Sequence, residues 1–338
     1  MAPVFSVLTR RQLGLLLGAV VLLAVVVLCS LAFGARSVPV TEAWRSLVDP
    51  DPTSSDHLVV RDLRVPRTIV GLAVGGALGL AGTVMQGLTR NPLADPGVLG
   101  VNAGAAVGVV VAINVFGIGS ALGWMGFAMA GAAGASLVVH LLGARGRHAS
   151  PATLALAGAA VAAMLTAVTT AILLLDQRTL DQFRFWVVGS LTGGEDRVLA
   201  AVSPFLVAGV VLALLLGPTL NALGLGDDVA VSLGHRIEVA RALGLLAVVL
   251  LVGSAVSIAG PIGFVGLVVP HVARSLGGPD HRWLLPASIV LAPLLLVGAD
   301  VVGRLVVRPG ELQVGIVTAL LGAPFFVALV RRRRLVES

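Results

Sequence analysis

The sequence predicts an all-α integral membrane protein with about ten transmembrane helices, folded as a single polytopic domain over residues 1–338. Composition gives the first reason: 57% of the residues are hydrophobic and 12% are charged, about half the charged fraction of soluble domains. The mean hydropathy is +1.02. The second reason is that apolar segments recur along the chain, most of them long enough to cross the roughly 30 Å hydrocarbon core of a bilayer.

Ten apolar segments are interpreted as membrane spans. In order, they are about 12–33, 68–88, 97–118, 119–143, 152–175, 198–217, 242–259, 261–273, 283–303 and 312–330. The first could be mistaken for a cleaved signal peptide, but its apolar run exceeds a normal h-region of about 7–15 residues. The eighth is short and starts at Gly260-Pro261, which favours a broken or tilted helix there.

The second and third segments flank the most informative stretch of the chain. Residues 68–88 carry no charge, and five glycines in them allow neighbouring helices to approach closely: Gly71, Gly75, Gly76, Gly79 and Gly82. The loop that follows, Asn91-Pro92-Leu93-Ala94-Asp95-Pro96-Gly97, contains two prolines that break helix geometry at the membrane edge. These features predict a packed bundle rather than a lone anchor.

Arginines near the two ends of the chain predict its orientation. Arg10-Arg11 precede the first span and Arg331 to Arg334 follow the last, so both termini are expected in the cytoplasm, in agreement with an even number of spans. The expected location is the cytoplasmic membrane, with lipid around the spans. The loop 34–67 is the exception, because it places five arginines on the outer side.

Several kinds of chemistry lack the residues they need. The chain has 23 basic side chains, all of them arginine, so neither a P-loop nor lysine Schiff-base chemistry is expected. The histidines are scattered without metal-ligand spacing, which predicts no metal site and no cofactor. The pI near 11.3 reflects arginines that flank the spans and does not indicate nucleic-acid binding. If this protein moves a solute uphill, the energy must therefore come from another subunit or an ion gradient.

An ion gradient has little support in the spans. Ion-coupled carriers usually place ionisable groups deep within their helices. Here Asp300 is the only carboxylate inside an expected span, and Arg304 follows it by four residues. On a helix this spacing makes an i,i+4 ion pair, which favours a locally neutralised charge over a proton relay.

The inner segment from Asn221 to Arg241 differs from a simple connector. Asp227-Asp228 can cap a short helix that Gly234 ends, and a second helix can begin near His235. Two short helices on the inner face would form a docking surface. The alternative is an amphipathic helix that lies on lipid.

An ordered set of segments resembles one family. The set begins with residues 64–104. The other segments are LDQFRFWVVGSL (180–191), GPIGFVGLVVPHVAR (260–274), DHRWLLP (280–286) and ADVVGRLVVRPGELQVGIVTALLGAPF (299–325). Together they resemble the FecCD/BtuC-type permeases of ABC importers, which take up iron siderophores and vitamin B12. The resemblance covers about residues 10–334. Within the family, the sequences of residues 88–104 and 183–186 most resemble those of ferric-enterobactin permeases.

The resemblance implies a type II ABC importer permease fold with two five-helix halves. It also implies a non-enzymatic subunit that moves a ferric siderophore from an extracytoplasmic binding protein into the cytoplasm. ATP hydrolysis would occur on separate cytoplasmic ATP-binding subunits, and the second permease of the pair would be a paralogue. Alternatives are a cobalamin or haem import permease, an ion-coupled secondary carrier, and a membrane receptor or scaffold.

The resemblance also implies roles for particular residues. The coupling helices that contact the ATPase carry an Ala-x-x-Leu-Gly pattern in this family, and the expected coupling residues here are Asp227, Asp228, Ala230, Leu233 and Gly234. The cytoplasmic gate would contain Asn91, Leu93, Ser150 and Thr153. Arg64, Arg67 and Arg304 would grip glutamates of the binding protein, with lipid-headgroup anchoring as the alternative.

Overall fold

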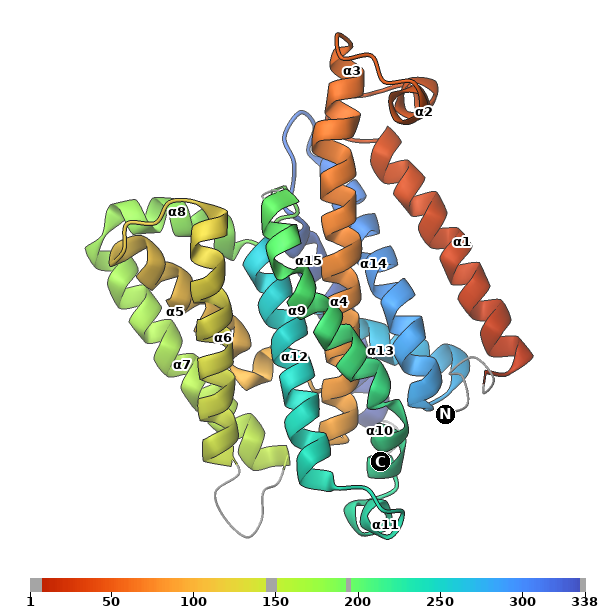
Figure 1. Cartoon of the computed structure of the whole chain (residues 1–338), viewed down its shortest axis with the longest axis vertical. Coiled ribbons are helices and arrows are strands. Elements are labelled where there is room, and N and C mark those ends of the chain that lie inside the picture. Colours follow the sequence, from red (N-terminus) through yellow and green to blue (C-terminus); the bar gives the residue numbers. More distant parts are fainter. Residues whose placement is uncertain (1–7, 144–150, 193–195, 335–338) are drawn as a thin grey trace.

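The computed structural model describes residues 8–143, 151–192 and 196–334, which form helices joined by short connections, with no strand among them (Figure 1). In chain order the α-helices are α1 (Arg10–Ala32), α2 (Val40–Val48), α3 (Ser55–Leu58), α4 (Val65–Thr89), α5 (Val101–Asn114), α6 (Ala121–Gly143), α7 (Pro151–Leu175), α8 (Gln177–Val187), α9 (Asp196–Leu215), α10 (Gly217–Gly224), α11 (Asp227–Ser232), α12 (Ile237–Ala259), α13 (Val265–Gly277), α14 (His281–Val306) and α15 (Val314–Arg334). A π-helix (Val59–Arg64) joins α3 to α4, and a 3-10 helix (Pro96–Leu99) precedes α5.

Each of the ten expected spans coincides with one of these helices, so the prediction of an all-α membrane protein is confirmed. Among the described residues, seven helices are long and apolar enough to cross a membrane: α1, α6, α7, α9, α12, α14 and the continuous Ser55–Thr89 stretch that ends in α4. The helix α5 and the apolar part of α15 (Val314–Leu329) are shorter, and α13 has 13 residues.

Two expected spans begin later than the sequence indicated. The third was expected from residue 97, but a 3-10 turn comes first and Gly100, with φ of 72°, separates it from α5. The eighth was expected from residue 261, but residues 260–264 are not helical and α13 begins at Val265. Gly260 and Phe264 both have positive φ, which a helix cannot accommodate. The expected break is thus confined to the entry into α13.

The helix α4 occupies the middle of the bundle (Figure 1). Its residues from 74 to 88 are all buried, and α12, α13 and α14 pack against it. A Cβ atom at Gly75 would lie 2.7 Å from Pro293 Cα, and one at Gly82 would overlap the carbonyl oxygen of Gly266. The prediction that glycines permit close helix contact is confirmed at these two positions.

The other helices surround this core in two groups. Helices α5, α6, α7 and α8 pack together on one side, and α1 packs against α14 on the other. In Figure 1, α2, α3 and α8 lie at one end of the bundle, which we call the α8 end. The short helices α10 and α11 lie at the opposite end, called the α11 end, where α1 begins.

Candidate functional site

The α8 end contains a set of charged side chains, which we call the arginine cluster: Arg64, Arg67, Asp300 and Arg304 are buried, and Glu311 is exposed. Arg67 lies in the first turn of α4 and faces α14. Its Nε donates to both carboxylate oxygens of Asp300, at 3.1 and 3.0 Å, and its Nη2 donates to Oδ1 at 2.7 Å. Its Nη1 donates to Glu311 Oε2 at 2.6 Å. One guanidinium group therefore binds two carboxylates, which strengthens each hydrogen bond.

The other two arginines attach the end of α1 to the same place. Arg304 donates to the Ser30 carbonyl at 3.0 Å and to Ser30 Oγ at 2.7 Å, and it pairs with Asp300 Oδ2 at 3.1 Å. Arg64 donates to the carbonyls of Leu31 and Ala32, both at 2.7 Å. These bonds satisfy carbonyl groups at the α1 C-terminus that have no partner within the helix.

The guanidinium groups of all three arginines form hydrogen bonds with other residues of this chain. Arg64 is 4% exposed, Arg67 is 9% exposed and Arg304 is 2% exposed. These are the residues expected to grip a binding protein, and that role stays a prediction. The geometry adds a role that sequence reasoning missed, because the cluster fastens α1 and the segment before α15 to α4 and α14.

The expected i,i+4 pair of Asp300 and Arg304 is present, with its oxygen and nitrogen 3.1 Å apart. Asp300 is 1% exposed and also binds Arg67. Two guanidinium groups on one buried carboxylate form a structural ion-pair network. The ion-coupled carrier alternative gains no support from this geometry.

A cavity of about 350 Å³ opens beside the arginine cluster. The three arginines of the cluster line it together with Arg36, whereas the acidic lining residues are Asp62 and Glu311. The excess of basic groups favours a carboxylate-bearing partner at this position.

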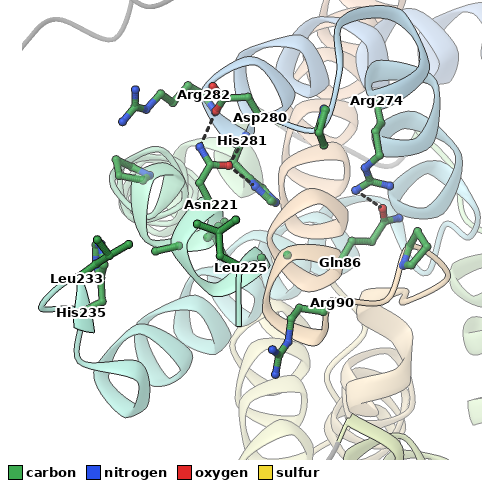
Figure 2. Close-up of a pocket in the computed structure, with 17 residues that line it drawn as sticks. Gln86, Arg90, Asn221, Leu225, Leu233, His235, Arg274, Asp280, His281 and Arg282 are labelled. Carbon is green, nitrogen blue, oxygen red and sulfur yellow. Dashed lines mark hydrogen bonds between the residues drawn. The ribbon is translucent and has the colours of Figure 1, made fainter. Parts of the chain in front are cut away.

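A larger pocket, of about 850 Å³, lies at the α11 end between the C-terminus of α4, α10 and the start of α14 (Figure 2). Asn221 joins two of its walls: Nδ2 donates to Asp280 Oδ1 at 2.6 Å, and Oδ1 accepts the backbone N–H of His281 at 2.8 Å. On the α4 wall, Arg274 donates to Gln86 Oε1 at 3.3 Å.

Basic side chains outnumber acidic ones around this pocket. Among the described residues that line it, three are arginines, Arg90, Arg274 and Arg282, and one is a carboxylate, Asp280. Asp280 is also the N-cap of α14, where it accepts the Arg282 backbone N–H at 2.8 Å. The electrostatics therefore favour a negatively charged group in this pocket.

The short helix α11 forms the rim of the same end of the bundle. Its N-cap is Gly226, with φ of 113°, so the expectation that Asp227 and Asp228 cap the helix is wrong. Both acids occupy its first turn, where the helix dipole favours negative charge. Asp227 pairs with Arg90 at 3.1 Å and with Arg241 at 2.9 Å. One carboxylate thus joins α11 to the end of α4 and to α12.

A second helix does begin near His235, as expected, but it is not short. Gly234 has φ of 85° and ends the turn after α11, as expected, but the next helix is the membrane span α12, which begins at Ile237. The two short helices are α10 and α11 instead. Ala230 within α11 is fully buried, whereas Leu233 on the turn after it is 60% exposed and available to a partner.

Comparisons with known proteins decide the family. The model of the FecCD transport family matches residues 22–332. This chain belongs to the FecCD transport family. Its membership makes it a membrane permease and not the catalytic subunit of an importer, and it confirms the resemblance stated from the sequence.

Among relatives of this FecCD chain is the ferric enterobactin transport system permease protein FepD of Escherichia coli K12, which is 48% identical over 321 residues that cover 94% of each chain. The iron(3+)-hydroxamate import system permease protein FhuB of Bacillus subtilis is 40% identical over 96% of this chain and 86% of its own length. A solved inward-facing structure of a metal-chelate type ABC transporter has 30% identity and a TM-score of 0.82, covering 95% of this chain and 99% of its own.

The expected gate residues of this FecCD chain are placed in part. Asn91 and Leu93 form one turn, in which Asn91 Oδ1 accepts the Leu93 backbone N–H at 2.9 Å. Thr153 is exposed in the first turn of α7, a helix that packs against Pro96–Leu99 just after the turn. Ser150 lies outside the described residues.

The sequence reasoning missed the contacts that connect these expected sites. Arg90 precedes the gate turn and binds Asp227 of the expected coupling segment, so the two sites are in direct contact. Arg90 has φ of 51°, an uncommon conformation for a residue with a side chain. The signal that could have found this pair is the opposite charge of Arg90 and Asp227, which both lie in segments expected on the inner side of the membrane.

Proposed function

We propose that this FecCD-family chain is the permease subunit of an ATP-driven importer that carries a ferric siderophore into the cytoplasm. The observation that carries the proposal is the family match over residues 22–332, together with 48% identity to a ferric enterobactin permease along nearly the whole chain. The importer is completed by cytoplasmic ATP-binding subunits, an extracytoplasmic siderophore-binding protein and a second permease.

In this proposal the α11 end faces the cytoplasm and the protein lies in the cytoplasmic membrane with both termini inside. The support is that α1 begins at this end with Arg10 and Arg11, as the positive-inside rule requires. The long apolar surface of α1, including Leu17 (58% exposed) and Val21 (64% exposed), would face lipid.

The ATP-binding subunit would dock on α11. The expected coupling residues lie on or beside it, and Leu233 is exposed where a partner would touch. The basic pocket behind α11 would accept a negatively charged group of the same subunit. A membrane-surface role for α11 is less favoured, because Asp227 and Asp228 would be repelled by anionic lipid headgroups.

The binding protein would dock on the α8 end around the arginine cluster. Arg64, Arg67 and Arg304 lie at the base of a cavity there, and Arg36 lies at its exposed rim, with 55% of its side chain exposed. Acidic groups of a binding protein would meet the rim first and the cluster next. Anchoring of the same arginines by lipid phosphates is the alternative.

The second permease would pack against α15, and its being a paralogue rests on the family resemblance. The support from this chain is an apolar cavity of about 590 Å³ along α15, beside exposed Ile316 (39%) and Leu320 (65%). The gate would lie on the cytoplasmic side and contain Asn91, Leu93, Ser150 and Thr153.

Haem and cobalamin are the alternative cargoes. The hemin transport system permease protein HmuU of Yersinia pestis is 38% identical to this chain, and a vitamin B12 permease of Klebsiella pneumoniae is also 38% identical. Both identities are lower than that of the ferric enterobactin permease, which favours iron chelates.

Uptake of labelled iron tests the proposal. Cells that lack the gene and cells that regain it would be given catecholate, hydroxamate and mixed ferric siderophores, with haem and cobalamin as controls. The expected result is loss and recovery of uptake for at least one ferric siderophore. Loss confined to haem or cobalamin would overturn the iron assignment and leave the permease intact, whereas no loss for any cargo would overturn transport itself.

A further inference from the structure

The helix α2 has an apolar side that does not pack against the described part of the chain. Its exposed hydrophobic residues, which we call the α2 face, are Val40 (63% exposed), Trp44 (61%), Leu47 (44%) and Val48 (66%). With 3.6 residues per turn, these positions fall within an arc of about 100°. Ala43, on the neighbouring side, is buried in a cluster with Val60. One side of α2 therefore fastens it to the chain, while a second, apolar side is open to the surroundings.

Two contacts fix the level of α2 relative to the membrane spans. Ser30 Oγ, near the end of α1, lies 2.8 Å from Thr68 Oγ1, where the uncharged stretch 68–88 of α4 begins. The edge of the hydrocarbon is therefore close to Thr68. Val60, which packs with Ala43 of α2, precedes Thr68 by eight residues of one continuous helix, a rise of about 10–12 Å. Because a helix with its side chains is about 10–12 Å across, the near side of α2 reaches the headgroup layer.

Polar contacts of α2 indicate which way the α2 face points. Glu42 Oε2 lies 3.3 Å from His57 Nε2 in α3, the turn of the Ser55–Thr89 helix that is farthest from the spans (Figure 1). Glu42 is two positions from Trp44, which places the two residues about 160° apart around α2. Since the Glu42 side faces the outermost turn, the α2 face on the opposite side points back toward the bilayer. Arg45 pairs with Glu42 at 3.0 Å and so belongs to the outer, polar side.

The lipid-facing surface of α1 leads up to the α2 face. Leu28 (56% exposed) and the C-cap residue Phe33 (45% exposed) present apolar side chains at the end of α1. The two helices are in contact, and α2 lies just beyond the C-terminal end of α1 (Figure 1). Only 17% of the apolar window of α1 is buried inside the chain, so lipid must surround most of this span. The lipid around the end of α1 therefore also meets α2.

We propose that the α2 face lies in the headgroup layer of the bilayer at the α8 end, with Trp44 at the boundary between head groups and hydrocarbon. Tryptophan is enriched at this boundary, and helices with one apolar and one charged side bind there. A protein partner is disfavoured, because it would have to enter between α2 and the bilayer. The lipid contact holds the loop 34–67, and with it Arg36 at the rim of the cavity beside the arginine cluster, at a fixed height above the membrane.

The test measures the surroundings of spin labels on the complete transporter in vesicles of phosphatidylcholine and phosphatidylglycerol. Cys29 is the only cysteine in the sequence, so single cysteines are placed in a Cys29→Ser background. A nitroxide at Leu47→Cys reports on the α2 face and leaves Trp44 in place. Collision rates of the label are measured with oxygen, which concentrates in lipid, and with a water-soluble nickel chelate. The ratio of oxygen to chelate collisions is expected to be at least about threefold higher for Leu47→Cys than for Arg45→Cys.

Arg45→Cys is the matched control, because it lies two residues away on the polar side of α2 with 69% of its side chain exposed. Leu17→Cys on α1 (58% exposed) gives the reference ratio for a span in lipid. Equal ratios for Leu47→Cys and Arg45→Cys would place the α2 face in water and overturn the proposal. Protection of Leu47→Cys from both reagents would overturn it in favour of a protein neighbour, and protection only after addition of the binding protein would identify that neighbour. The readout is independent of the cargo, so it can be decided even if the proposed function fails.

Discussion

Asp300 is the residue through which the arginine cluster is neutralised. It binds Arg67 and Arg304, and Glu311 is the only other carboxylate in the cluster. Asp300→Asn therefore leaves buried positive charge without its partner and is expected to lower the free energy of unfolding by about 3–5 kcal/mol. Thermal unfolding in detergent measures this. The exposed Asp62→Asn is the control, and equal unfolding midpoints for the two variants would contradict the prediction.

Asp95 gives the gate loop a pH-dependent stability. Burial raises the pKa of its carboxyl above the usual 3.8, and the Gly97 N–H that it accepts at 2.8 Å only partly opposes this shift. Since the raised pKa belongs to the folded state, this site stabilises the fold below pH 3.8, and that stability is lost as the pH rises through the folded pKa.

Asp95→Asn keeps the acceptor for the Gly97 N–H and removes the titration. The unfolding midpoint of the variant minus that of the wild type should therefore increase from about pH 3 to about pH 8. The measurement is a series of thermal unfolding curves across this range. A difference that stays constant with pH would argue against a raised pKa.

Single residues also show where sequence reasoning stops. The pair of Asp300 and Arg304 was predictable, because a spacing of four on a helix brings side chains together. The partnership of Arg67 with Asp300 joins residues 233 apart in the chain, and no local rule brings them together. Likewise Trp186 was interpretable as an interfacial aromatic residue, but its unpaired N–H is visible only in three dimensions.

At the scale of elements, the turn after α11 has a conformation that only glycine adopts easily. Gly234 has φ of 85°, so Gly234→Val strains this turn and should displace Leu233 from the partner surface. The expected result is normal insertion with ATP hydrolysis uncoupled from uptake, the ratio of uptake to hydrolysis falling about tenfold or more, equivalent to about 1.4 kcal/mol.

Gly18→Ala in α1, outside the proposed docking surfaces, is the control for this turn. No atom lies within 4 Å of its added Cβ, and its φ is not positive. Both variants would be measured for uptake and for ATP hydrolysis in membranes with equal amounts of the chain. A normal ratio of uptake to ATP hydrolysis in Gly234→Val would show that the turn after α11 does not couple the two processes.

Hydropathy was a good predictor of the long elements and a poor one of their ends. The spans α1, α6, α7 and α12 follow from apolar runs alone. The start of α11 was wrong because Asp227 and Asp228 are favourable both as caps and in a first turn, and the preceding Gly226 competes for the cap. The entry into α13 depends on φ values that no apolar pattern reports.

For the whole molecule, the decisive prediction concerns which end meets the ATPase. Cys29 is the only cysteine in the sequence, so a Cys29→Ser background leaves no other reactive thiol. Ser232→Cys in this background should crosslink to the ATP-binding subunit and not to the binding protein. A control cysteine at exposed Leu63 on the α8 end (65% exposed) should give the reverse pattern. Crosslinks from Ser232→Cys to the binding protein would contradict the proposed orientation and place the α11 end on the outer side.

The overall architecture could be predicted because composition excludes a soluble fold and ten apolar segments leave few alternatives to a helical bundle. For the interior, the sequence predicts that helices pack closely but not which residues are in contact. Glycines in residues 68–88 indicated close packing, but the partners Pro293 and Gly266 emerge only from the assembled bundle. The cavity beside the arginine cluster has the same origin, since it is lined by residues from several distant helices.

The carboxylate of Asp227 connects α11 to two other helices, α4 and α12. A movement of α11 is transmitted through the Asp227–Arg90 pair, at 3.1 Å, to the C-terminus of α4 just before Asn91. The Asp227–Arg241 pair, at 2.9 Å, transmits it to the first turns of α12. Both contacts are ion pairs, and the Asp227 side chain is 38% exposed, so dissolved ions weaken them together. The stiffness with which force passes from the inner surface into the membrane is therefore set partly by the ionic strength around the protein.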